Sequence, residues 1–253
     1  MEMKNKYIAK RYWKDSSSPM GAVNAKAKQY DDVINLSLGD PDLLTDKGVI
    51  EQAYKDTLAG HTKYTEFRGD PELRAEICKF YKDEYDMDVT DDEIIITAAG
   101  TLAMHLVMET ILDDGDEVIL QAPYFTPYPK QVEMSRGIPV ELPTYEEEDF
   151  QVNVERLIVL NTQSNPTGRC LTVETMEKIA AIAEKYDLLV VCDDIYTAFS
   201  YQNPFVPFAS LPGMRKRTII INTVSKNFTM TGWRVGNIIA PAEFIKVMTD
   251  VNV

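Results

Sequence analysis

The stretch TIIINTVSK, residues 218–226, joins an apolar, β-branched run to a short loop that holds two hydroxyl residues and a lysine. β-branched residues at this density favour a strand, and near-continuous apolarity is typical of a strand that is buried on both faces. Four further runs of the same kind occur upstream, at 93–97, 117–121, 158–161 and 188–192. We therefore expect a sheet whose strands all lie in the protein interior.

The segments between these runs have helical periodicity. A helix is expected to open at Asp70-Pro71, and another from about 102 to 112. A third has four small or apolar residues on one face: Met176, Ile179, Ala180 and Ala183. Strands that alternate with helices predict an α/β fold of three layers, α/β/α, around a mostly parallel sheet. In such a fold, functional groups collect at the carboxyl edge of the sheet.

The composition narrows the class of protein. The chain has 253 residues, of which 45% are hydrophobic and 26% are charged, as in ordinary globular proteins. A net charge of −14 argues against a nucleic-acid partner. Three scattered cysteines and two histidines form no zinc-type cluster, so no metal is expected. The sequence shows neither an apolar signal segment nor a membrane-spanning run, which predicts a cytoplasmic protein without a membrane partner.

The chain is expected to have two parts. Residues 1–35 are interpreted as an N-terminal arm or part of a small domain, and residues 36–253 as one large domain. Residues 153–157 read as a helix cap and a single turn that runs straight into a strand, which predicts a missing segment between 157 and 158. The chain also stops at Val253 inside an expected helix that begins near Pro241, so we expect the C-terminal small domain to be absent.

Polar motifs follow several of the apolar runs and would meet at the carboxyl edge. The turn SNPTG occupies 164–168, Asp193 closes the run LLVVC, and Ala99-Gly100-Thr101 separates a strand from a helix. Each motif alone is commonly a plain loop, a helix cap or a helix start. Their arrangement at one edge favours a shared site.

Lys226 lies among groups that suit a phosphate. The hydroxyls of Thr223 and Ser225 precede it and Arg234 follows it. An isolated lysine is usually a solvated surface residue, but hydroxyls beside a guanidinium make a phosphate cradle. Backbone N–H groups at the helix start near Gly100 would approach the same anion.

In order and spacing, these motifs resemble those of the class I and II aminotransferases, the fold-type-I pyridoxal-phosphate enzymes that include aspartate and aromatic aminotransferases. The resemblance runs from about residue 34 to 240, and SKNFTMTGWRVG (225–236) is similar to the family's lysine signature. Other similar pieces are LGDPD (38–42), YTEFRGDPELR (64–74) and APYFTPY (122–128). The resemblance implies the aminotransferase large domain with an incomplete small domain.

The resemblance also implies roles for individual residues toward pyridoxal 5′-phosphate. Lys226 would form the Schiff base (the internal aldimine) and shuttle a proton, and Asp193 would keep the pyridine nitrogen protonated. Tyr196 and Asn165 would hydrogen-bond the ring 3′-oxygen. Phe125 would stack on the ring face, although it is also compatible with a plain core aromatic.

The phosphate would be held by the backbone of Gly100 and Thr101, by the hydroxyls of Thr223 and Ser225, and by Arg234. Ala99 stands where relatives often carry a polar residue, so this cup would depend more on backbone donors.

Two more residues resemble family positions. Tyr64 resembles the tyrosine that reaches the phosphate from a neighbouring subunit, which implies a homodimer with shared active sites; the alternative is a tyrosine that packs in a loop. Gly39 resembles the glycine that lets the substrate come close. No residue of this sequence matches the arginine that binds the substrate α-carboxylate.

The leading functional hypothesis is transfer of an amino group between an α-amino acid and a 2-oxo acid. A C–S β-lyase on the same scaffold is an alternative, because it would use the same Lys226 and Asp193. A ligand-sensing domain without turnover is a third, which the complete set of cofactor residues argues against. The sequence does not indicate which amino acid is the donor.

Overall fold

The computed structural model describes residues 6–9, 19–34, 39–151, 159–161, 163–201 and 203–252. The chain divides into two compact units, residues 1–42 and 43–253. The first contains helix α1 (Pro19–Ala27). The predicted boundary at residue 35 stays a prediction, and the predicted gap between 157 and 158 lies outside the described residues.

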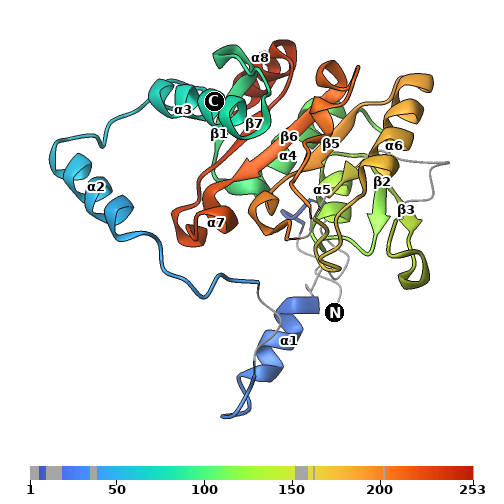
Figure 1. Cartoon of the computed structure of the whole chain (residues 1–253). Coiled ribbons are helices and arrows are strands. Elements are labelled where there is room, and N and C mark those ends of the chain that lie inside the picture. The colour runs from blue at the N-terminus through green and yellow to red at the C-terminus, as the bar shows by residue number, and fades with distance from the viewer. Residues whose placement is uncertain are drawn as a thin grey trace. The chain divides into compact units, whose positions relative to one another are not determined.

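The second unit is built on a mixed sheet with the strand order β1-β7-β6-β5-β4-β2-β3 (Figure 1). The strands are β1 (Ile94–Thr97), β2 (Glu117–Ala122), β3 (Ile138–Pro143), β4 (Val159–Leu160), β5 (Val190–Asp193), β6 (Thr218–Thr223) and β7 (Gly236–Ile239). Strands β3, β2, β4, β5 and β6 run parallel to one another, whereas β7 is antiparallel to both β1 and β6. The mostly parallel sheet is therefore confirmed.

Helices cover both faces of the sheet. On one face lie α4 (Ala99–Ile111), α5 (Tyr128–Met134) and α8 (Ala242–Val251), and on the other lie α3 (Pro71–Tyr85) and α6 (Val173–Lys185). Successive strand residues alternate between these layers: Val191 packs in the cluster with α4, while Val190 and Cys192 pack in the cluster with α6. This alternation follows from the two-residue period of a strand. The three-layer α/β/α fold is confirmed.

The remaining helices are short or lie outside the core. Helix α2 (Lys47–Leu58) has no buried residue, and α7 (Val224–Asn227) is a single turn at the end of β6. Short 3-10 turns are η2 (Asp91–Glu93), η3 (Glu146–Glu148), η4 (Thr197–Phe199), η5 (Phe208–Ser210), η6 (Arg215–Arg217) and η7 (Thr231–Trp233). Within the described residues, no helix is both long enough and apolar enough to cross a membrane.

The apolar runs at 93–97, 117–121, 158–161, 188–192 and 218–223 each contribute a strand to the sheet, while β3 and β7 were not anticipated. β3 reads IPVELP, and two prolines in six residues argue against a central strand. It lies at the edge of the sheet, where an unpaired backbone position tolerates proline. β7 has four residues, directly after the lysine signature, and too short a pattern to be recognised.

Replacing Ile179 by alanine is expected to lower the free energy of unfolding by about 2–5 kcal/mol, because the change leaves a cavity in a packed core. Ile179 is 0% exposed and packs between α6 and the sheet. Urea denaturation measures the loss. Val173→Ala on the same helix is the control, since Val173 is 45% exposed. Equal losses in the two variants would contradict the proposed position of α6.

Candidate active site

The carboxyl ends of the central strands lie side by side. Thr97 of β1 and Thr223 of β6 both pair with Gly236 of β7, and Asp193 at the end of β5 pairs with Ile221 of β6. Because β4, β5 and β6 are parallel, the segments that follow them emerge at one edge of the sheet. The motifs singled out in the sequence belong to these segments.

Asp193 is a buried carboxylate that is only partly satisfied. It is 5% exposed, and the Tyr128 hydroxyl donates a short hydrogen bond to its Oδ2. Within the described residues, Oδ1 has no partner at hydrogen-bond geometry. Burial raises the pKa of Asp193 from 3.8 to about 6, although Tyr128 and the backbone of Ile195 oppose the rise. An unpaired buried acceptor of this kind suits an N–H donor from a ligand.

Tyr128 and Asn161 were missed by the sequence analysis. The Asn161 side-chain amide donates to the Tyr128 hydroxyl over 3.3 Å, and Tyr128 in turn donates to Asp193. Burial raises the pKa of Tyr128 well above its ordinary value, so its hydroxyl stays protonated and donates. Tyr128 lies 65 positions from Asp193 in the sequence, and no local pattern links them.

The turn that carries Lys226 begins directly after β6. Thr223 caps α7, since its hydroxyl accepts from the backbone N–H of Ser225 over 3.2 Å. Ser225 is buried, and its hydroxyl has no hydrogen-bond partner among the described residues. Lys226 itself is half-buried.

Asn227 connects this turn to the segment after β5 by two hydrogen bonds. Its side-chain amide donates to the Thr197 hydroxyl over 2.7 Å, and its oxygen accepts from the backbone N–H of Ala198 over 3.2 Å. Both partners belong to η4, which begins immediately after Tyr196. The Lys226 turn and the Tyr196 turn are therefore neighbours.

Asn165 and Tyr196, which were predicted to contact the same ring oxygen, lie together. The Asn165 amide donates to the Tyr196 hydroxyl over 3.2 Å. Asn165 comes from the turn after β4 and Tyr196 from the turn after β5, so neighbouring strands bring them together. Burial raises the pKa of Tyr196 and keeps its hydroxyl protonated.

The start of α4 is a candidate cup for an anion. The residue that caps this helix is Ala98, whose side chain accepts no hydrogen bond, so the first N–H groups receive no side-chain cap. A Cβ on Gly100 would lie 2.7 Å from the Ile195 side chain and 3.2 Å from that of Thr223. This helix start therefore packs directly against the turn after β5 and the end of β6, and position 100 has no room for a side chain. Thr101 is exposed at the same helix start.

The other predicted site residues differ in their burial. Phe125 is half-buried and meets the Tyr128 ring edge-on, with ring centroids 5.6 Å apart. Arg234 is exposed and donates to the Thr231 carbonyl over 2.9 Å. Tyr64 is fully exposed, and Gly39 belongs to the first unit. Their roles toward a ligand stay predictions.

The donor set suits one kind of ligand. An anion would bind the uncapped start of α4, a ring N–H would meet the free oxygen of Asp193, and a ring oxygen would meet Asn165 and Tyr196. The amine of Lys226 would complete the site. A planar aromatic ring with a basic nitrogen, an oxygen substituent and a phosphate fits these groups. Among the described residues, no cluster of His, Cys, Asp or Glu could hold a metal.

The chain is similar to known proteins of one family. Residues 31–252 match the family model "Aminotransferase class I and II". The chain is 35% identical to an aspartate aminotransferase of Geobacillus stearothermophilus, with 96% of this chain and 66% of the relative covered. For an aspartate aminotransferase of Pyrococcus horikoshii the identity is 36%, with coverage of 100% and 67%. The chain thus spans about two thirds of the length of these relatives, slightly less for the first.

Solved structures show the same similarity. The structure of Thermus thermophilus aspartate aminotransferase with maleate matches with a TM-score of 0.92 and 34% identity, covering 98% of this chain and 68% of that one. The aspartate aminotransferase of Rhizobium meliloti matches with a TM-score of 0.93 and 30% identity, covering 98% and 66%.

Asp193→Asn is expected to change how stability depends on pH. The folded-state pKa of about 6 lies above the ordinary 3.8, so the ionised carboxylate destabilises the fold at neutral pH and this penalty disappears in acid. Between about pH 8 and about pH 4, the free energy of unfolding of the cofactor-free protein should rise by about 2.5 kcal/mol relative to that of the variant. Urea denaturation across this range measures it. Asp83→Asn, at an exposed position, should show no such trend; a similar trend there would contradict the account.

Tyr128→Phe is expected to raise the pKa of Asp193 above about 6, because the lost hydrogen bond favoured the ionised carboxylate. Carbon NMR titration of the labelled Asp193 carboxyl group measures the change. Tyr124→Phe is the matched control, since Tyr124 donates to Glu141 instead. An unchanged titration in Tyr128→Phe would mean that Tyr128 does not tune Asp193.

Proposed function

Because the chain belongs to the class I and II aminotransferase family, we propose that it binds pyridoxal 5′-phosphate and transfers an amino group between an α-amino acid and a 2-oxo acid. The observation that carries the proposal is the buried, half-satisfied carboxylate of Asp193 beside the turn of Lys226. Asp193 ends β5 and the Lys226 turn follows the neighbouring parallel strand β6, which supports a shared site at the carboxyl edge of the sheet.

Separate groups of residues would hold the phosphate and the ring oxygen of the cofactor. The uncapped N–H groups near Gly100 and Thr101, together with the Ser225 hydroxyl, would bind the phosphate. Asn165 and Tyr196 would donate hydrogen bonds to the ring oxygen. We assign Thr223 to the same cup, because its side chain packs against Gly100.

Asp193 and Lys226 would perform the proton chemistry. With a pKa of about 6, Asp193 is mostly ionised at neutral pH and would hold a proton on the ring nitrogen. When bound, pyridoxal phosphate supplies an electron-accepting ring for the bonding pair of the substrate α-carbon. The Lys226 amine would carry the proton between that carbon and the C4′ carbon of the cofactor.

The relatives suggest which donor to test first. Several of them are called aspartate aminotransferases. Aspartate is therefore the proposed amino donor, and a four-carbon 2-oxo acid is the corresponding product.

We also propose that the active form is a homodimer with shared sites. Helix α2 has no buried residue, and it exposes several large apolar side chains, which are Val49, Ile50, Tyr54 and Leu58. Exposed apolar residues gathered on one helix favour a protein partner. The following segment also exposes Tyr64 and Phe67. A second copy of the chain would cover these residues, and Tyr64 would reach its phosphate.

The proposed location is the cytoplasm. All three cysteines lie in the described part of the chain and are free, which suits a reducing compartment.

Lys226→Ala is expected to abolish covalent retention of the cofactor and conversion of aspartate, because the change removes the proposed Schiff-base amine. Borohydride reduction of the purified chain with pyridoxal phosphate, followed by peptide mass mapping, should label Lys226. Lys178→Ala, an exposed position on α6, should behave like the unsubstituted chain.

Product analysis then tests the type of reaction. Formation of pyridoxamine phosphate from aspartate alone would support amino transfer. Release of pyruvate, ammonia and a thiol from cystathionine would instead indicate a C–S lyase. Absence of label at Lys226 would contradict the cofactor assignment.

A further inference from the structure

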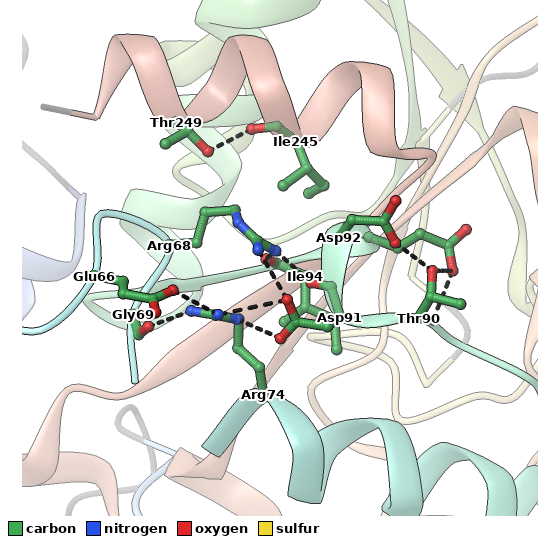
Figure 2. Close-up of polar contacts among 11 residues, drawn as sticks. Glu66, Arg68, Gly69, Arg74, Thr90, Asp91, Asp92, Ile94, Ile245 and Thr249 are labelled. Carbon is green, nitrogen blue, oxygen red and sulfur yellow. Dashed lines mark hydrogen bonds and ion pairs between the residues drawn. The ribbon is translucent and has the colours of Figure 1, made fainter. Parts of the chain in front are cut away.

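Arg74 is a buried cation whose ligands come from two other segments (Figure 2). Arg74 is only 2% exposed, although it lies near the start of α3. Its Nε donates to Asp91 over 2.8 Å and its Nη2 donates to Glu66 over 2.8 Å. Its Nη1 donates to the backbone carbonyl of Gly69. A single guanidinium thus links α3, η2 and the loop before α3.

Arg68, in the same loop, makes further hydrogen bonds to η2 and β1. Its Nη2 donates to the other carboxylate oxygen of Asp91 over 2.8 Å, so Asp91 bridges the two arginines (Figure 2). Its backbone carbonyl accepts from the N–H of Ile96, in β1, over 2.9 Å. Gly69 has φ +94°, and a Cβ there would lie 2.4 Å from the Ile96 side chain. The loop therefore lies directly against β1, and position 69 has no room for a side chain.

We call Glu66, Arg68, Arg74 and Asp91 the arginine anchor. On one side of the anchor lies Tyr64, which is two residues before Glu66 and fully exposed. On the other side, Ile96 is followed by Thr97, at the strand end that leads into the anion cup. The anchor therefore links the segment of the exposed tyrosine to the strand that leads into the proposed phosphate site.

Stability alone does not explain such an anchor. Burying a guanidinium carries a desolvation penalty, and apolar residues of similar volume often stabilise a fold equally well. The Arg74 guanidinium holds the pKa of Asp91 below its ordinary value, so the carboxylate remains ionised and paired. Several directed hydrogen bonds do, however, restrict the loop to a single geometry.

We propose that Arg74 is a positioning residue, whose bonds to Asp91, Glu66 and the Gly69 carbonyl hold the loop so that Tyr64 is presented to the phosphate site of a second copy of the chain. The inference rests on the proposed function, in which Tyr64 acts on the partner's cofactor. It goes further by assigning the order of that loop to a buried cation that touches neither cofactor nor substrate.

The test combines two measurements on Arg74→Met, which keeps the side-chain volume and removes the charge. Hydrogen exchange of residues 62–69 should become faster by about tenfold, because the loop loses its anchor. The Kd for pyridoxal phosphate should rise by about tenfold, as it should in Tyr64→Phe, which removes one hydrogen bond to a charged group. In the Tyr64→Phe background, Arg74→Met should change the Kd by less than about twofold.

Control variants distinguish a loss of loop positioning from a general loss of stability. Lys178→Met removes an exposed ion pair with Glu174 and should alter neither measurement. If Arg74→Met does not fold, Asp91→Asn and Glu66→Gln each remove one charge from the anchor with little change in shape, and should show the same dependence on Tyr64.

Equal losses of affinity with and without Tyr64, or unchanged exchange of residues 62–69, would overturn the proposal. If pyridoxal phosphate binds at Lys226 but Tyr64→Phe has no effect on its Kd, only this inference fails. If the unsubstituted chain binds no pyridoxal phosphate, the proposed function fails as well.

Discussion

The chemistry of the site depends on one electrostatic constraint, the burial of the Asp193 carboxylate at the end of β5. Placing an ionised group in the interior is unfavourable unless its oxygens are satisfied. Here Tyr128 satisfies one oxygen, and the other has no partner among the described residues. The fold gains no stability from this arrangement, which is expected where a ligand supplies the missing donor.

The sheet supplies the geometry that surrounds this carboxylate. Parallel strands β4, β5 and β6 deliver Asn165, Asp193 and the Lys226 turn to one edge. The antiparallel strand β7 then joins β6 to β1, which brings the start of α4 to the same place. Gly236 makes this possible, because a Cβ there would lie 2.9 Å from the Asn222 carbonyl and 3.0 Å from Ala99. The backbone itself is close-packed around the cup.

Much of this could be predicted from sequence, for physical reasons that differ from one feature to the next. Long β-branched runs such as 218–223 indicate buried strands by composition alone, and the face with Ile179 indicates a helix by its period. Short or proline-containing strands lack such a pattern, so β3 and β7 were missed. Tyr128 was missed because its importance arises from a contact across 65 positions.

The arginine anchor was hidden for the same reason. Arg74 was noted only as part of a family-like segment, and an arginine on a helix is normally exposed. Its burial depends on carboxylates at Glu66 and Asp91 that only the folded chain brings together. Local patterns thus revealed the residues that end strands, while the residues that orient them required the structure.

In the proposed site, the carboxylate of Asp193 faces the ring nitrogen of a cofactor held at Lys226. NMR of pyridoxal phosphate with an isotope-labelled ring nitrogen, bound to the purified chain, measures the protonation of that nitrogen directly. At about pH 8 the nitrogen should be protonated in the unsubstituted chain and unprotonated in Asp193→Asn. A nitrogen that is unprotonated in both, or protonated in both, would contradict the account.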